Sequence, residues 1–242
     1  MNTYEEGFSF YLKYTKEKEI LAKELISLFR KLKVNSVLDI GAGNGDLASL
    51  IFNQVKRYVA IEPRKKFVKS LKDKEINVIE DNFPCNIGNK KFDFILCSHS
   101  TPSLKKDYEP FLKVAFEKLN KNGNLLLITY LGGEDDWNTL LKEINIKPFE
   151  NASARYLDRK NFVEQFGDLK EWFVNTKIES SSMENMIKAL SFVASGGEEE
   201  KKNAFLSKSK EISEILNEKY YNKESNNYFF PFKHVFLMVN KK

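Results

Sequence analysis

Residues 34–46 read Val-Asn-Ser-Val-Leu-Asp-Ile-Gly-Ala-Gly-Asn-Gly-Asp, and this stretch predicts the fold of the chain. A short apolar run carries one acid near its end, Asp39, and then gives way to glycines at alternate positions. These glycines are Gly41, Gly43 and Gly45. An apolar helical pattern over residues 47–54 follows. Strand, glycine-rich turn and helix in this order predict a tight turn at which a ligand can approach backbone N–H groups.

A second predicted strand, residues 57–61, leads directly to an acid, Glu62, 21 residues after Gly41. An acid at this distance from a glycine loop typically accepts hydrogen bonds from the hydroxyls of a ribose. Nicotinamide cofactors use a similar loop, but here the third glycine comes two residues after the second rather than three. Asp39 would also repel the pyrophosphate of a dinucleotide, whereas its carboxylate would attract an ammonium group.

The loop and its two acids resemble the first motifs of the class I S-adenosylmethionine-dependent methyltransferases. S-adenosylmethionine carries an ammonium, a sulfonium and a ribose, so one carboxylate near the loop and one beyond it suit this cofactor. The resemblance implies that Asp39, Gly41, Gly43 and Glu62 bind it. A strand–helix turn with a purely structural role is the alternative.

Polar residues follow the next two predicted strands, 76–79 and 92–97. Ligands of open parallel sheets lie beyond the carboxyl ends of the strands. We therefore expect Asp81 and Asn82 to meet the adenine, with Phe83 stacked on the base, although these residues would also suit a turn without a ligand. Ser98 and His99 follow the second of these strands, whose end faces the transferable methyl in this fold, and the resemblance implies that Ser98 contacts the cofactor. His99 is a candidate base or substrate contact, or a loop histidine without a role.

The remaining pattern predicts an α/β fold with a doubly wound, seven-stranded, mostly parallel, Rossmann-like sheet. Residues 145–157 read as a loop before a helix that Asp158 caps, and the last strand is expected over 234–239. Two helices are expected within 181–222, the first with a capping box of Ser181 and Glu184. One domain, 1–242, is predicted, with three parts. These parts are an N-terminal lid and helix (1–33), a cofactor-binding core (34–180 and 228–242) and a helical insertion on the substrate side (181–227).

Composition narrows the class of protein. The formal net charge is only +5, spread over many Lys/Glu pairs, and by itself it neither demands nor excludes nucleic acid. Because the basic residues are dispersed rather than gathered in a patch, nucleic acid is not the partner that we expect. No apolar run is long enough to span a membrane, and the acidic N-terminus lacks a signal-peptide pattern. The two cysteines, Cys85 and Cys97, fit no metal-ligand spacing. Reduced cysteines in the cytoplasm are the simplest interpretation, and no metal is predicted.

The N-terminal segment narrows the resemblance to the histamine N-methyltransferase-like small-molecule group. The matching features are Tyr4-x-Glu6-x-Phe8, Tyr11-Leu12, the helix start Thr15-Lys16-Glu17, Trp137, and the helical insertion before the last strand. The resemblance implies a monomer in which Glu17 holds an amine substrate and, as a catalytic residue, accepts its proton, although an acid in a first helical turn also suits the helix dipole. The aromatic residues before Glu17 would close as a lid over the methyl donor, or serve as core. Phe232 and Lys233 stand where the family has a substrate-contacting asparagine, which argues against histamine itself.

The predicted function is S-adenosylmethionine-dependent methyl transfer to a small molecule, at an amine nitrogen, by in-line displacement. Three alternatives stay open: an RNA or protein acceptor, a binding protein without catalysis, and a nicotinamide oxidoreductase. The intact acids and glycines of the loop argue against the second of these, and Asp39 with the glycine spacing argues against the third.

Overall fold

The structure is a computed structural model that describes residues 4–100, 108–130, 135–146 and 152–242. The chain forms two compact units. The glycine-loop unit consists of Lys18–Tyr130, Arg155–Val174 and His234–Lys242, and the helical unit of Met1–Glu17, Leu131–Ala154 and Asn175–Lys233. The prediction of a single domain remains a prediction.

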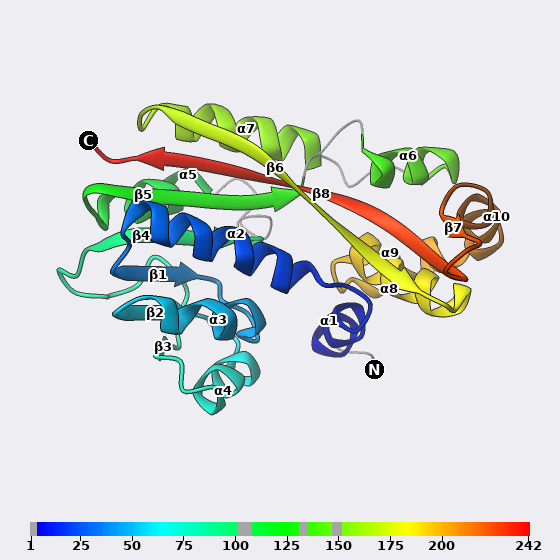
Figure 1. Cartoon of the computed structure of the whole chain (residues 1–242), viewed down its shortest axis with the longest axis horizontal. Coiled ribbons are helices and arrows are strands. Elements are labelled where there is room, and N and C mark those ends of the chain that lie inside the picture. The colour runs from blue at the N-terminus through cyan, green and yellow to red at the C-terminus, as the bar shows by residue number, and fades with distance from the viewer. Residues whose placement is uncertain (1–3, 101–107, 131–134, 147–151) are drawn as a thin grey trace. The chain divides into compact units, whose positions relative to one another are not determined.

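The sheet has the strand order β3-β2-β1-β4-β5-β8-β6, and a short strand, β7, pairs with β8. Figure 1 labels the strands β1 (Ser36–Ile40), β2 (Arg57–Ile61), β3 (Val78–Ile79), β4 (Phe92–Ser98), β5 (Leu119–Tyr130), β6 (Leu169–Ser180), β7 (Tyr221–Asn222) and β8 (Asn227–Asn240). Pairings from β3 through β5 are parallel, and β8 runs antiparallel to β5. The predicted α/β fold with a mostly parallel sheet is therefore confirmed.

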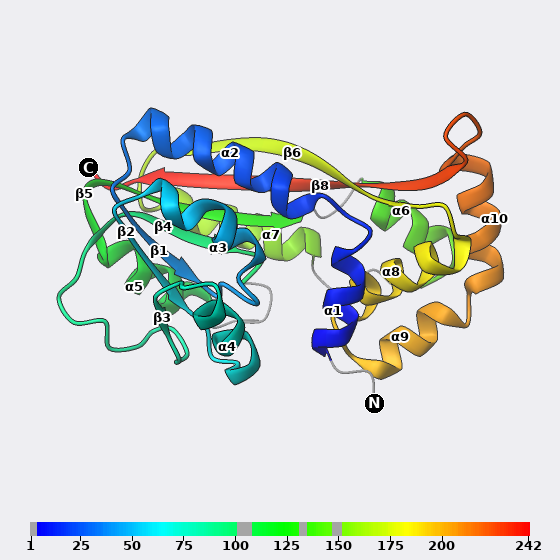
Figure 2. The same cartoon turned by 60° about the horizontal axis from the view of Figure 1, so that its bottom comes forward.

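Helices cover both faces of the sheet in the glycine-loop unit. They are α2 (Glu17–Leu32), α3 (Asp46–Ile51), α4 (Lys65–Asp73), α5 (Tyr108–Glu117) and α7 (Ala152–Glu164), with a 3-10 turn at Phe52–Gln54. Figures 1 and 2 show α2 on one face of the sheet and α5 with α7 on the other. In the described residues no helix is both long enough and apolar enough to cross a membrane.

The core of this unit fixes which way the strand residues point. Apolar residues at alternate strand positions pack against Leu21, Leu25 and Phe29 of α2. These strand residues include Val37, Ala60, Phe94, Leu96, Leu126, Ile128, Phe236 and Met238. Successive side chains of a strand point to opposite faces, so Asp39 shares the face of Val37 and Tyr58 shares the face of Ala60. One acid of β1 is thus directed to the α2 side of the sheet.

The helical unit contains α1 (Tyr4–Leu12), α6 (Asp136–Glu143), α8 (Met183–Ser195), α9 (Glu199–Leu206) and α10 (Ser209–Lys219). Three N-terminal aromatic rings, Tyr4, Phe8 and Tyr11, pack on Phe192 with ring-centroid distances of 5.4–5.8 Å. A second aromatic cluster joins Trp137 to Phe205, Phe230 and Phe232. The aromatic residues of the N-terminus therefore have a packing role, and their role as a lid remains a prediction.

Several predicted boundaries are wrong. The segment 181–222 holds three helices instead of two, and the first is capped by Ser182, whose Oγ accepts a hydrogen bond from the Asn185 amide at 3.3 Å. Helix α7 begins at Ala152, six residues before the predicted cap. The earlier start was missed because the first turn lacks an apolar period in the sequence. Strand β8 begins at Asn227, and its aromatic run continues the strand in spite of Pro231.

Candidate functional site

The three glycines of the loop between β1 and α3 serve different purposes. All have left-handed φ angles, +80° at Gly41, +60° at Gly43 and +81° at Gly45. A Cβ on Gly41 would lie 2.5 Å from the Cβ of Ser100, and one on Gly45 would lie 2.6 Å from Leu71. A Cβ on Gly43 would meet no atom of the described residues within 4 Å. Close packing thus requires glycine at both ends of the loop, whereas the middle glycine faces open space.

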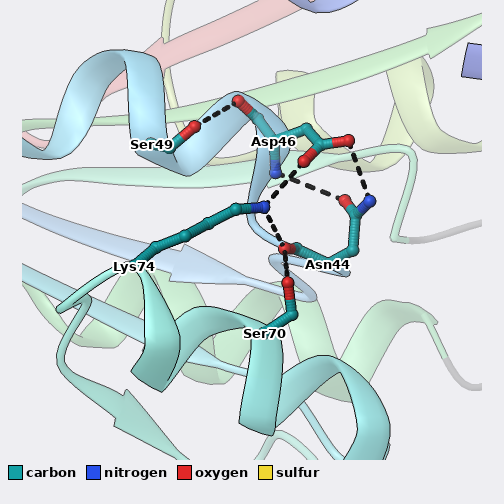
Figure 3. Close-up of polar contacts among 5 residues, drawn as sticks. All are labelled: Asn44, Asp46, Ser49, Ser70 and Lys74. Atoms are coloured by element: carbon teal, nitrogen blue, oxygen red, sulfur yellow. Dashed lines mark hydrogen bonds and ion pairs between the residues drawn. The ribbon is translucent and has the colours of Figure 1, made fainter. Parts of the chain in front are cut away.

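The loop is fastened to α4 by a polar network (Figure 3). Lys74 Nζ donates to the carbonyl oxygen of Asn44 at 2.8 Å and to Asp46 Oδ1 at 2.7 Å. Ser70 Oγ donates to the same carbonyl at 2.8 Å, and Asn44 Nδ2 donates to Asp46 Oδ2 at 2.8 Å. Ser49 Oγ donates to the Asp46 carbonyl at 2.9 Å. We call this network the clamp; its residues are Asn44, Asp46, Ser49, Ser70 and Lys74. The clamp was not predicted from the sequence, and it holds the backbone of the loop in one conformation.

Glu62, directly after β2, is 4% exposed and anchored by backbone amides. Its Oε2 accepts from the Gly43 N–H at 2.9 Å, and its Oε1 accepts from the Arg64 N–H at 3.0 Å. A carboxylate has about four lone-pair positions, so two amide bonds leave capacity for two hydroxyls. The side chain predicted to bind a ribose is therefore held in place beside Gly43, and the ribose contact itself remains a prediction.

Asp39 is 2% exposed, and the Tyr58 hydroxyl donates to its Oδ2 at 2.6 Å. Burial raises the pKa of Asp39 to about 6, the Tyr58 hydrogen bond acts against that rise, and the Glu62 charge adds to it. Tyr58 was not predicted as a site residue from the sequence, although it lies on the same face of β2 as Ala60. The strand register, which pairs Val37 with Tyr58, brings it to Asp39.

The residues predicted to meet the adenine behave differently from one another. Asp81 and Asn82 are exposed, and Asp81 Oδ1 accepts from the Asn82 amide at 2.7 Å. Phe83 is 8% exposed and packs edge-on against Phe111 of α5, with ring centroids 5.1 Å apart. Phe83 thus has a core partner, and the adenine contacts of all three residues remain predictions.

Ser98 and His99 lie where β4 ends, beside the glycine loop. The Ser98 Oγ is buried and has no hydrogen-bond partner in the described part of the chain. His99 has a left-handed φ of +54°, and its amide donates to Ile128 O at 2.9 Å. Its Nε2 lies 3.2 Å from Nδ1 of His234, and its ring centroid lies 4.4 Å from that of Tyr130. His234 and Tyr130 were not identified from the sequence, because only the pairing of β5 with β8 brings them here.

Glu17 belongs to the helical unit, at the start of α2. It is 1% exposed, and the Tyr11 hydroxyl donates to its Oε2 at 2.6 Å. Thr15 Oγ1 accepts from the Glu17 amide at 3.1 Å, which confirms the predicted role of Thr15 at the helix start. A substrate contact of Glu17 remains a prediction.

Comparisons with known proteins give the family. A family model described as a methyltransferase domain matches residues 11–169. No curated protein matches the chain. Among solved structures, the YcgJ protein of Bacillus subtilis is 14% identical, with a TM-score of 0.58 over 89% of this chain and 96% of that one. A putative methyltransferase (BH2331) of Bacillus halodurans C-125 is 18% identical, with a TM-score of 0.55 over 89% and 99%.

A third structure, the plantazolicin methyltransferase BpumL in complex with SAH, is 12% identical, with a TM-score of 0.54 over 93% of this chain and 84% of that one. At these identities the likenesses show a common fold. The family model carries more, because it spans more than half of the 242 residues and covers β1, the glycine loop and the ends of β2, β3 and β4. The chain therefore belongs to the methyltransferase-domain family and is an S-adenosylmethionine-dependent methyltransferase.

Proposed function

We propose that the chain transfers the methyl group of S-adenosylmethionine to a small molecule, at an amine nitrogen, and that the cofactor is held at the glycine loop. The observation that carries the proposal is the pair formed by Gly43 and Glu62. An open space in front of Gly43 lies next to a buried carboxylate that the loop's own amide holds. A ribose has two neighbouring hydroxyls, and this pair offers it both space and acceptors.

The chemistry of the surrounding residues fits the cofactor. Gly43 leaves room for a ligand to approach the backbone, and the buried Ser98 hydroxyl, without a hydrogen-bond partner in the described residues, can donate to one. Asp39 supplies a negative charge near the loop for the ammonium group. Asp81 and Asn82 are accessible acceptors and donors for the adenine amino group and ring nitrogens, and Phe83 follows them in the chain.

When bound, S-adenosylmethionine supplies an electrophilic methyl group on a sulfur that is already an excellent leaving group. The protein then has to hold the acceptor in line with the methyl and to exclude water. Such alignment lowers the activation free energy by on the order of 7–11 kcal/mol. His99, at the end of β4, is the side chain that we assign to the proton of the acceptor.

Glu17 supports an amine as the acceptor. Its carboxylate is buried and fixed by Tyr11, and a fixed carboxylate attracts a cationic amine. The resemblance to the histamine N-methyltransferase-like group supports the same class of acceptor, while Phe232 and Lys233 argue for a molecule other than histamine. We also propose a monomer, which the resemblance to the histamine N-methyltransferase-like group supports, that acts in the cytoplasm without binding nucleic acid. The dispersed Lys/Glu charges favour a small molecule over nucleic acid as the acceptor.

A thermal-shift titration with S-adenosylmethionine, S-adenosylhomocysteine and NAD tests the proposal. Binding to the native state raises the melting temperature by mass action. We expect a rise with the two adenosyl ligands and none with NAD. If neither adenosyl ligand raises the melting temperature, the proposed function is wrong.

Glu62→Ala tests the ribose contact. Hydrogen bonds to a charged group contribute about 1.5–3 kcal/mol, so we expect S-adenosylhomocysteine to bind roughly tenfold to hundredfold more weakly in calorimetry. Glu80→Ala is the control, because Glu80 is an exposed acid that follows the neighbouring strand β3. Equal affinities of the two variants would exclude Glu62 as the ribose ligand.

A further inference from the structure

The only two histidines of the chain meet, although 135 residues separate them. Nδ1 of His234 lies 3.2 Å from Nε2 of His99, and His234 is completely buried. Tyr130, opposite His234 in the β5–β8 pairing, lies against both rings, with centroid distances of 4.4 Å to His99 and 5.0 Å to His234. We call His99 and His234 the histidine pair, and Tyr130 is the titratable ring in contact with both.

A contact between two imidazole nitrogens at this distance requires one proton between them, donated by one ring and accepted by the other. A further proton can enter on an outer nitrogen, because its charge is then shared across the contact. Binding a second further proton would place two N–H groups face to face in a buried site. The geometry therefore favours uptake of one proton by the pair and opposes uptake of two.

Under the proposed function, the histidine pair lies at the end of β4, where the methyl acceptor would lose its proton. His99 directly follows β4, and its left-handed φ of +54° is uncommon for a residue other than glycine. The next residue, Ser100, packs so closely on Gly41 that a Cβ there would lie 2.5 Å from its own Cβ. Strained backbone that persists in a packed structure clusters at functional sites. Packing of Ser100 on the glycine loop thus places His99 beside it.

We propose that the histidine pair acts as one proton acceptor for methyl transfer, an inference that rests on the proposed function. The lone pair of the acceptor forms the new bond to the methyl carbon, and the electron pair of the breaking C–S bond goes to sulfur. The proton that the acceptor atom loses enters the pair through His99 and leaves later to water. His99 is the catalytic residue, and His234 is a positioning residue that orients the His99 ring and shares its charge.

This assignment narrows the class of acceptors. A histidine pair that receives a proton is useful to a methyl acceptor that loses an N–H or O–H proton during the transfer, such as a primary or secondary amine or a hydroxyl. A tertiary amine or a thioether has no such proton and gains nothing from the pair. The proposed amine acceptor is therefore one that still carries hydrogen on its nitrogen.

Nitrogen-15 NMR of the histidine rings tests the pair directly, because the chain has only two histidines to resolve. In the wild-type protein we expect two separate titration steps, with the second proton bound at least about one pH unit below the first. In His234→Gln, which keeps a hydrogen-bonding side chain but cannot take a proton, His99 should titrate in one step. Two independent, coincident titrations in the wild type would overturn the pair.

The same spectra test whether the pair faces the transferable methyl. Sinefungin carries an amine in place of the sulfonium methyl, whereas S-adenosylhomocysteine has no charge there. We expect the first protonation of the pair at lower pH in the sinefungin complex than in the S-adenosylhomocysteine complex, because like charges repel. Identical titrations in the two complexes would overturn the proposal. Binding is followed separately by thermal shift, so a failure of the proposed function would appear as no melting-temperature rise with either ligand.

Discussion

At the scale of single residues, the candidate site contains two buried acids, and each accepts hydrogen bonds from identified donors. Asp39 accepts from Tyr58, and Glu62 accepts from two backbone amides. Buried polar groups are costly unless they are hydrogen-bonded, and these bonds offset that cost. They also fix the directions in which the remaining lone pairs point, which is what recognition of a cofactor requires.

The raised pKa of Asp39 makes stability depend on pH. Burial raises this pKa from 3.8 to about 6, so between these two values the folded protein binds more protons than the unfolded chain. The contribution of Asp39 is thus most favourable at low pH and is lost as pH rises through about 6. Asp39→Asn removes this dependence and should gain stability relative to wild type between pH 4 and pH 7, by up to about 3 kcal/mol.

Urea unfolding of both proteins at several pH values measures this difference. Asp81→Asn is the control, because Asp81 is exposed and its substitution should leave the pH dependence of the wild type intact. A constant stability difference between Asp39→Asn and wild type across this range would show that Asp39 has an ordinary pKa.

Sequence reasoning at this scale reached the residues whose signal is local. The glycine spacing, the acid before the loop and the acid after β2 are all visible in one stretch of chain. Tyr58, Tyr130 and His234 were missed because their roles depend on strand register, which sequence periodicity does not give. Phe83 was assigned to a ligand although it also packs on Phe111, since an aromatic residue at a strand end suits both roles.

At the scale of elements, the glycine loop depends on α4 as much as on β1 and α3. Lys74 and Ser70 both donate to the Asn44 carbonyl, and Lys74 also pairs with Asp46 (Figure 3). A loop with three left-handed residues has many alternative conformations, because glycine is permissive. The clamp selects one of them before a ligand arrives, which lowers the entropic cost of binding.

Lys74→Met should therefore weaken S-adenosylhomocysteine binding severalfold without preventing folding. The Lys74–Asp46 pair is about one-third exposed, so solvent screening limits its contribution to stability to roughly 1 kcal/mol or less. Lys72→Met is the matched control, because Lys72 is an exposed lysine in the last turn of α4, two residues before Lys74. Calorimetry and urea unfolding of both variants check this, and equal affinities would show that the clamp does not organise the loop.

Element boundaries were predicted well where the apolar period is regular and poorly elsewhere. Strand β2 was predicted with its observed limits, whereas β5 begins at Leu119 and contains an irregularity where its register with β4 shifts. Strand pairing, which no local signal reports, extends β8 through Pro231. The helical insertion contains three helices rather than the two that were predicted.

At the scale of the whole molecule, the two compact units separate the predicted roles. All residues assigned to the cofactor, with His99, His234 and Tyr130, belong to the glycine-loop unit, and Glu17 belongs to the helical unit. The order of strands and loops sufficed to predict the fold and the family. The identity of the acceptor depends on side chains that no motif specifies, so the sequence limited it only to a class.

A comparison of Gly43→Ala with Gly88→Ala tests whether the cofactor binds at the glycine loop. The two glycines have similar left-handed φ angles, +60° and +65°, and in the part of the chain that the structure describes a Cβ on either would meet nothing within 4 Å. Both variants should lose a similar stability, roughly 1–2 kcal/mol, because alanine is strained in this conformation. Only the Cβ at position 43 would occupy the space assigned to the cofactor.

The measurement is a calorimetric titration of both variants and the wild type with S-adenosylhomocysteine. We expect Gly88→Ala to bind S-adenosylhomocysteine like the wild type. Gly43→Ala should bind it at least about tenfold more weakly, a difference of about 1.4 kcal/mol in binding free energy. Equal binding by the two variants would contradict this expectation, because the ligand would then lie elsewhere than at the glycine loop.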